Sequence, residues 1–254
     1  TTGVGFGYEY SANKPHGLER FQYTQVRMGV SVVMTLYAQS EPEAERAANA
    51  AYARFEELEQ VMSDYRRDSE LTLLVANSGQ GPQRVSPDMM RVLVRSQEVS
   101  ELSDGEFDIT AGPLIRLWRE TRKSGKLPFH SQVVEAKKLV GWRNLVLDPK
   151  RGTADLRLKG MTIDLGGVAK GYACDAAIDA LRANGVDHAL VEAGGDIAAS
   201  KAPPGKRGWT IEVRGWDKPV MLENGAISTS GDTEQFVDIG GRRFSHIVDP
   251  RTGY

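Results

Sequence analysis

MTIDLGGVAKGYACDAAIDALRANG, residues 161–185, takes the chain from a predicted strand through a glycine-containing turn into a helix. Cys174, Ile178 and Leu181 recur at helical spacing, and Asn184-Gly185 is typical of a helix C-terminus. Because free cysteine usually behaves as a small apolar residue, this spacing favours a core position for Cys174 over a reactive thiol. The stretch therefore predicts a fold that combines strands with helices.

Strands and helices follow one another irregularly in the rest of the chain. A β-branched apolar run predicts one strand over residues 26–38, and Ser40 with Glu43 predicts a capped helix directly after it. Ser86-Pro87 predicts the start of another helix. Shorter helices are predicted over 113–121 and 132–140, strands at NLVLD, HALVEA, WTIEVRG and GAISTS, and a hairpin that turns at Gly240-Gly241. Since regular βαβ alternation is missing, we expect an α+β fold with mixed sheets, packed helices and two closely associated subdomains.

Composition narrows the functional classes. The chain has 254 residues, 26% of them charged, with a net charge of −2, so the sequence gives no electrostatic reason to expect a nucleic-acid partner. No apolar run approaches the roughly 20 residues that a membrane-spanning helix needs. We expect residues 1–20 to be a loose tail and residues 21–254 to form a single domain. A start at Thr1 rather than Met is compatible with a removed export signal.

Four polar, glycine-punctuated loops stand at the edges of predicted elements. We call them the DGEFD loop (104–113), the DLGG loop (164–171), the EAGG loop (192–197) and the C-terminal loop (STSGD…HIVDPRTG, 228–253). The glycines of the DLGG loop allow a ligand to approach the backbone, and free N–H groups at a helix start favour an anion. Lys170 would face a phosphate as a compact charge, although a tight turn with a solvated lysine explains this stretch about as well.

Acidic residues recur in all four loops: Asp104, Asp108, Asp164, Asp196, Asp232 and Asp249. Hard cations prefer oxygen ligands, and Mg²⁺ commonly joins one or two carboxylates to substrate phosphates. Taken singly, each aspartate is more typical of a turn, but their recurrence in all four loops favours a functional role for at least one. His246 is the one histidine of four that lies in such a loop. Because no G-x-S-x-G elbow is present, a serine hydrolase is disfavoured.

Six motifs taken in order carry a resemblance to a known family. MSDYRRDSELTLLVANSG, DGEFDITAGPLIRLW, IDLGGVAKGYACDAAIDAL, LVEAGGDI, ISTSGD and FSHIVDPRTGY together resemble the ApbE family, the FAD:protein FMN transferases, over residues 28–254. The resemblance implies FAD bound between two subdomains with Mg²⁺ bridging its pyrophosphate. It also implies that FMN is transferred to a threonine hydroxyl of an acceptor protein, with release of AMP.

The same resemblance implies site residues. The cofactor-binding positions would be Met28, Tyr65, Glu106, Phe107, Asp108, Asp164, Lys170, His246 and Ile247. The Gly167 carbonyl would be a ligand of Mg²⁺. His246 would take part in transfer as the base that removes the acceptor's proton, and Asp249 is the candidate to orient it.

Two departures from the family pattern leave alternatives open. Val30 stands where the family commonly has threonine, and family members continue past the DP-x-TG stretch into a strand and a helix with further metal ligands, which we expect this chain to lack. Transfer of FMN is therefore weighed against hydrolysis of FAD to FMN and AMP and against non-catalytic FAD binding. The family's acceptors are membrane redox subunits, which makes a periplasmic location the expectation.

Overall fold

The computed structural model describes residues 17–213, 215–230 and 236–254. Its main sheet has five strands in the order β1-β2-β6-β7-β10, and every neighbouring pair is antiparallel. The strands span Glu19–Arg27 (β1), Val30–Ala38 (β2), His188–Ala193 (β6), Asp196–Ala199 (β7) and Gly225–Ser228 (β10). The combination of antiparallel sheets and packed helices confirms the predicted α+β class.

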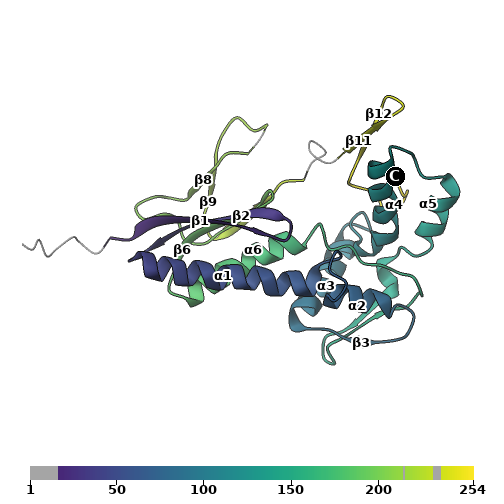
Figure 1. The fold of residues 1–254 in the computed structure, drawn as a ribbon, viewed down its shortest axis with the longest axis horizontal. Helices are drawn as coiled ribbons and strands as arrows, with labels where there is room; N and C mark the ends of the chain where they lie inside the picture. The colour runs from purple at the N-terminus through teal and green to yellow at the C-terminus, as the bar shows by residue number, and fades with distance from the viewer. Residues whose placement is uncertain (1–16, 214, 231–235) are drawn as a thin grey trace, which may run out of the picture.

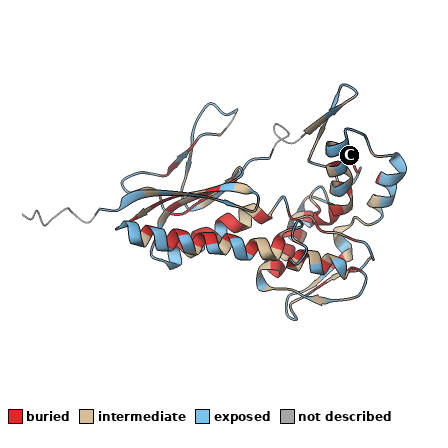
Figure 2. Ribbon diagram, viewed as in Figure 1, coloured by how far each residue is buried: buried red, intermediate tan, exposed pale blue. Residues whose placement is uncertain are grey.

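Two long helices cover one face of this sheet (Figure 1). They are α1 (Glu41–Met62) and α6 (Ala169–Ala183). Fully buried side chains of β2 and α1, among them Met34, Leu36 and Phe55, form the core between helices and sheet (Figure 2). Cys174 lies in the same core, where burial raises the pKa of its thiol to about 12, so the predicted structural position is confirmed.

The other half of the molecule consists of helices and a small sheet at the far end of α1 (Figure 1). Its helices are α2 (Glu70–Ala76), α3 (Pro87–Leu102), η1 (Ile109–Ala111), α4 (Gly112–Ser124), α5 (His130–Lys137) and η2 (Trp142–Asn144). A small sheet of order β3-β5-β4 joins Gln83–Arg84, Thr153–Leu156 and Leu145–Asp148. The predicted cap of α3 is present, because the Ser86 side chain accepts a hydrogen bond from the Met89 N–H.

Two hairpins complete the fold. One joins β8 (Trp209–Ile211) to β9 (Val220–Leu222), and the other joins β11 (Phe236–Ile239) to β12 (Arg242–Ser245). The second turns at Gly240-Gly241, as the sequence predicts. It lies beside α4, next to which the C-terminus also ends (Figure 1). Within the described residues, no helix combines the length and the apolar character needed to cross a bilayer.

Several local predictions were wrong. The strand predicted over 26–38 is present only from Val30, because Met28 and Gly29 adopt positive φ angles of 50° and 73° and reverse the chain before it. The preceding strand β1 begins at Glu19, inside the range expected to be a tail. In α1 the Ser40 side chain makes no capping bond, and Glu43 instead accepts from the Gln39 N–H.

The stretch MTID is not a strand, although its side chains alternate as a strand's would. Met161, Ile163 and Leu165 are buried, whereas the residues between them are half-buried. Among the described residues no strand pairs with this segment, so alternation here reflects an extended path through the core.

Candidate functional site

The DLGG loop lies between two of the other loops. The Asp164 N–H donates to the carbonyl oxygen of Ile109 in the DGEFD loop over 2.8 Å. At the other end of the DLGG loop, Lys170 Nζ lies 3.6 Å from Asp196 Oδ2 in the EAGG loop. Segments distant in sequence therefore meet around the N-terminus of α6.

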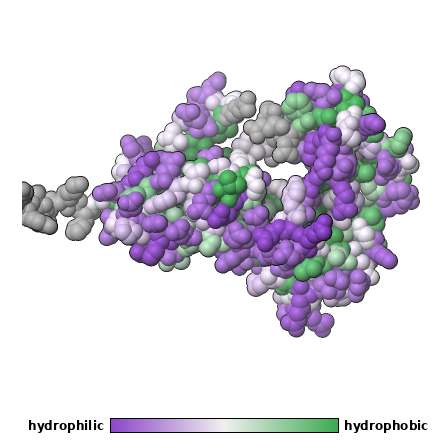
Figure 3. All heavy atoms as spheres, in the orientation of Figure 1, coloured by the Kyte–Doolittle hydropathy of each residue, from purple (hydrophilic) through white to green (hydrophobic). Residues whose placement is uncertain are grey.

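The first part of the C-terminal loop extends this arrangement. The Thr229 N–H donates to the Gly195 carbonyl oxygen over 3.2 Å, and the Ser228 hydroxyl donates to Asp196. The surface is hollowed between the sheet and the part of the molecule that carries α4 and β12 (Figure 3). Asp232, also considered a candidate, lies outside the described residues.

The last part of the C-terminal loop contacts the DGEFD loop. Arg251 Nη1 lies 2.9 Å from Glu106 Oε1 on the surface. The same guanidinium binds Asp249, since Arg251 Nε lies 3.2 Å from Asp249 Oδ1. Hydrogen bonds from the Arg251 side chain and backbone hold the pKa of Asp249 below its usual range. Asp249 is thus an ionised carboxylate already bound by an arginine, and its proposed role beside His246 stays a prediction.

An arginine that the sequence did not single out connects two candidate site residues, Tyr65 and Asp164, with Asp64. Arg119 Nη2, on α4, lies 2.7 Å from Asp164 Oδ2, and Nη1 bonds to Asp64. The guanidinium also lies over the ring of Tyr65, 5.3 Å from its centroid, an arrangement suited to cation–π attraction. We call Arg119, Asp64, Tyr65 and Asp164 the Arg119 cluster.

The surroundings of Asp164 act on the pKa of its carboxyl in opposite directions. Its side chain is only 10% exposed, and this burial raises the pKa of the carboxyl. The positive charge of Arg119 and the Gly166 N–H, 2.9 Å from Oδ1, lower the pKa, while the charge of Asp64 raises it. The net shift is upward, as expected for a desolvated carboxyl that shares the Arg119 guanidinium with a second acid.

The three adjacent candidates of the DGEFD loop differ in their surroundings. Asp108 is buried and acts as a local cap, accepting bonds from the backbone and hydroxyl of Thr110 and from the Trp142 N–H. Burial raises the pKa of its carboxyl. Phe107 faces the DLGG loop, since a Cβ placed on Gly167 would lie 3.6 Å from its ring. Glu106 is exposed.

Met28 lies at the turn between β1 and β2. Its N–H donates to Glu59 Oε2 over 3.3 Å, and its side chain packs against the main core. The turn lies close to the EAGG loop, because a Cβ on Gly194 would come within 2.9 Å of Val30 Cγ1. Met28 thus belongs to the same region as the loops.

His246 and Ile247 follow β12 directly. His246 is half-buried, and the Ile247 side chain is 55% exposed. The Ile247 N–H donates to Ser245 Oγ over 3.0 Å, which fixes the turn after the strand. An exposed apolar side chain at this place is available to a bound ligand.

The donor atoms fit a cation that is shared with a substrate. Across the described residues no group of three or more His, Cys, Asp or Glu side chains is arranged to hold a metal ion. Asp164 and Asp196 are already paired with Arg119 and Lys170. Gly167 is exposed just before α6 and offers a carbonyl oxygen, a ligand type that Mg²⁺ accepts. Such a site suits an ion that takes most of its ligands from phosphates and water.

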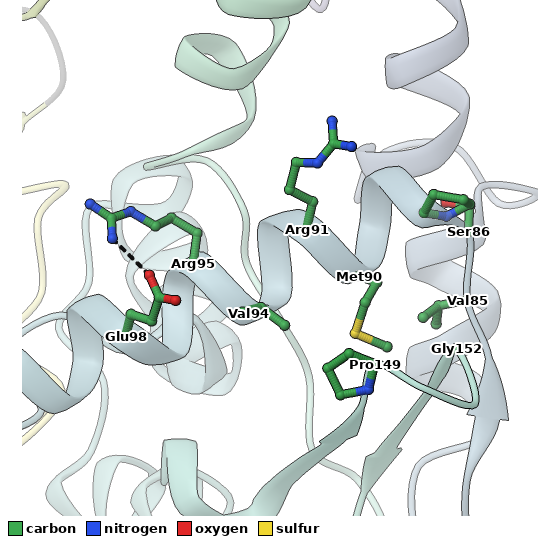
Figure 4. Close-up of a pocket in the computed structure, with 10 residues that line it drawn as sticks. Val85, Ser86, Met90, Arg91, Val94, Arg95, Glu98, Pro149 and Gly152 are labelled. Atoms are coloured by element: carbon green, nitrogen blue, oxygen red, sulfur yellow. Dashed lines mark hydrogen bonds and ion pairs between the residues drawn. The ribbon is translucent and has the colours of Figure 1, made fainter.

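A separate apolar cavity lies away from these loops. It measures about 540 Å³ and lies between α3 and the turn after β4, where Met90, Val94 and Pro149 face it (Figure 4). Arg95 stands at its edge and pairs with Glu98. None of the residues that line this cavity belongs to the four loops or to the Arg119 cluster.

Comparison with known proteins shows which protein family the chain resembles. The ApbE family model matches residues 28–254. A FAD:protein FMN transferase of Klebsiella pneumoniae is 28% identical over 244 residues, which cover 92% of this chain and 73% of the relative. One from Haemophilus influenzae is 30% identical, with 76% of this chain and 60% of the relative covered.

Solved structures agree with the sequence comparison. The flavin transferase ApbE of Vibrio cholerae superposes with a TM-score of 0.83 at 27% identity, covering 93% of this chain and 78% of that one. The ApbE protein of Thermotoga maritima gives a TM-score of 0.82 at 30% identity, with the same shares covered. The order of the motifs, the meeting of the loops and these matches together lead to one conclusion: the chain belongs to the ApbE family.

Proposed function

We propose that the protein transfers FMN from FAD to a threonine hydroxyl of an acceptor protein and releases AMP, with Mg²⁺ as the metal. The observation that carries the proposal is the meeting of the glycine-containing loops around the N-terminus of α6. Gly167 is exposed there, and free N–H groups at a helix start attract anions. The relatives from Klebsiella pneumoniae and Haemophilus influenzae are named FAD:protein FMN transferases, which supports FAD as the substrate.

Different residues of the loops have different proposed roles in binding FAD and Mg²⁺. Lys170 supplies positive charge beside the helix start, where the pyrophosphate would bind, and the Gly167 carbonyl would hold Mg²⁺ there. When bound, the cation neutralises charge on the phosphates during transfer. Asp164, held by Arg119, offers carboxylate oxygens as acceptors for hydroxyl or amino groups of the nucleotide. Exposed Ile247 provides an apolar surface for the flavin.

The transfer step needs a base and a leaving group. The acceptor oxygen attacks the phosphorus of the FMN half, the bond from that phosphorus to the bridging oxygen breaks, and AMP leaves with the bridging oxygen. The proton of the threonine hydroxyl moves to His246, since an imidazole can accept a proton near neutral pH. We propose a membrane redox subunit as acceptor and the periplasm as the compartment.

Measuring AMP release and covalently bound flavin distinguishes FMN transfer from FAD hydrolysis and from non-catalytic FAD binding. The protein is incubated with FAD and Mg²⁺, with a bacterial redox subunit that carries a threonine flavinylation site, and with the Thr→Val variant of that subunit. We expect AMP and gel-stable flavin fluorescence only with the threonine. AMP without acceptor would instead indicate hydrolysis, and bound FAD without AMP would indicate a carrier.

A single substitution tests the base. His246→Ala should leave the FAD dissociation constant within about twofold and lower the transfer rate by about 100-fold or more, the usual contribution of a general base. Arg95→Ala is the matched surface control, because Arg95 lies at the separate apolar cavity. Equal transfer by His246→Ala and parent would exclude the proposed proton acceptor.

A further inference from the structure

The segment that carries His246 is held at both ends by one tryptophan. Trp118, on α4, is 2% exposed. Its ring stacks on that of Phe244 in β12, with centroids 5.4 Å apart and planes inclined by 26°. Its indole N–H donates to the Gly253 carbonyl oxygen over 2.9 Å. His246 lies in the chain between these two contacts.

The far end of the segment packs closely against α5 and Trp118. A Cβ on Gly253, whose φ is 86°, would lie 2.6 Å from Val133 Cγ1 on α5. The rings of Tyr254 and Trp118 are arranged edge to face, with centroids 6.1 Å apart. Two backbone bonds close the loop, from the Gly253 N–H to the Asp249 carbonyl oxygen and from the Asp249 N–H to the Tyr254 carbonyl oxygen, at 2.8 Å and 2.9 Å.

We propose that Trp118 is a positioning residue, which clamps residues 244–254 on α4 and so fixes where the His246 imidazole stands. The inference rests on the proposed function for its catalytic consequence, whereas the clamp itself is a property of the fold. Trp118 needs no contact with substrate in this role. It acts by removing conformational freedom from the segment on which the proton acceptor is carried.

A second buried tryptophan provides a matched control. Trp209, on β8, is 8% exposed, and its indole N–H donates to the Lys201 carbonyl oxygen over 3.0 Å. Its neighbours belong to the β8–β9 hairpin and to strands β2, β6, β7 and β10 of the main sheet. Trp209→Phe therefore removes the same kind of hydrogen bond at a similar depth without touching residues 244–254.

Amide hydrogen exchange tests the clamp without requiring activity. Trp118→Phe keeps an aromatic ring on Phe244 but loses the N–H, so exchange over residues 245–254 should accelerate about 3- to 10-fold, the equivalent of one hydrogen bond. Trp118→Leu also loses the stacking and should accelerate it further, while Trp209→Phe should leave it unchanged. Equal exchange in parent and Trp118→Phe overturns the clamp even if Trp118→Leu fails to fold.

Steady-state kinetics test the consequence for His246. In Trp118→Phe we expect kcat for transfer to fall at least 3-fold while KM for FAD stays within about twofold, because the Arg119 cluster and Lys170 are untouched. Faster exchange with an unchanged kcat would overturn the positioning role and leave the proposed function standing. A parent protein that neither transfers FMN nor releases AMP would refute the proposed function, and the exchange result would still decide the clamp.

Discussion

Arg54 and Arg119 each join two carboxylates beside a tyrosine, but the first lies in the scaffold and the second lies among the loops of the candidate site. Arg54, on α1, bonds to Glu57 on the same helix over 2.8 Å and to Asp88 on α3 over 2.6 Å. The Tyr172 hydroxyl of α6 donates to the same oxygen of Asp88 over 2.6 Å. This arrangement, which we call the Arg54 cluster, ties three helices together.

The Arg119 cluster joins different kinds of segment. Arg119 stands on a helix, but Asp64 and Tyr65 follow the end of α1, and Asp164 opens the DLGG loop. Tyr65 contributes the face of its ring, and its side chain is 82% exposed. The Arg119 cluster therefore fixes loops, whereas the Arg54 cluster joins helices.

The two clusters shift the pKa of their carboxyls in opposite directions. Burial alone would raise the pKa of Asp88, but hydrogen bonds from Arg54 and Tyr172 outweigh it and hold the pKa below its usual value. The pKa of Asp164 is raised, because its side chain is half as exposed and the second acid in the cluster, Asp64, opposes its ionisation. Perturbed pKa values are common at functional sites but also occur in structural ion pairs, so the shift of Asp164 supports its candidacy only together with its position among the loops.

The largest effect is expected when the shared cation of the Arg119 cluster is removed. Arg119→Leu leaves Asp64 and Asp164 without their guanidinium and should lower the free energy of unfolding by about 2 kcal/mol at pH 7, less than for a fully buried pair because Arg119 is partly exposed. FAD should bind at least about 10-fold more weakly, because the Asp164 carboxylate loses its fixed position. Urea unfolding and FAD titration measure the two effects, with Arg119→Lys as the charge-conserving control.

The loss of unfolding free energy in Arg119→Leu should depend on pH in a defined direction. A carboxyl whose pKa is raised in the folded state destabilises the fold above that pKa, and the penalty disappears as the pH falls toward the unfolded value of about 3.9. Since the pKa of Asp164 is already raised, the deficit of Arg119→Leu should shrink continuously between pH 7 and pH 4. A deficit that is constant over this range would contradict the assigned role.

A smaller effect with a different pH window is expected for the Arg54 cluster. Arg54→Leu should lower the free energy of unfolding by about 1 to 2 kcal/mol, because Asp88 keeps its bond from Tyr172. Asp88 has a lowered pKa, so its contribution is present above the unfolded value and is lost only as the pH falls below about 4. The deficit should therefore be constant between pH 7 and pH 5, and FAD affinity should stay within about twofold. A tenfold loss of FAD affinity would show that the two clusters are not functionally distinct.

The sequence was sufficient for features that depend on local chemistry. The α+β class, the α3 cap at Ser86 and the Gly240-Gly241 turn follow from residues adjacent in the chain. The four loops could also be located, because glycine and acidic residues gather at the ends of elements. Their contacts in space required the structure, although the family resemblance implied them.

Features that depend on distant partners were missed. Arg119 lies in the middle of a helix, 55 residues from Asp64 and 45 from Asp164, and nothing beside it in the sequence distinguishes it from a solvated arginine. The Met28-Gly29 turn was hidden inside a β-branched run, although Gly29 was a local signal for it. Nothing beside Trp118 in the sequence indicated its contacts, since its partners Phe244 and Gly253 lie more than 100 residues away.

The smallest changes in unfolding free energy are expected when the hydroxyl of Tyr172 or of Tyr65 is removed. These two variants compare the Arg54 cluster directly with the Arg119 cluster. Tyr172→Phe removes a half-buried hydrogen bond to Asp88 and should cost about 1 kcal/mol of unfolding free energy. Tyr65→Phe should cost less than about 0.5 kcal/mol, because among the described residues its hydroxyl has no hydrogen-bond partner and the ring under Arg119 is kept. Denaturant unfolding of both variants at pH 7 gives the comparison. If the order were reversed, the Tyr65 hydroxyl would have to be buried against another group, and the Arg119 cluster would be a structural unit like the Arg54 cluster. The expected order instead leaves the exposed Tyr65 ring available for a flavin to cover.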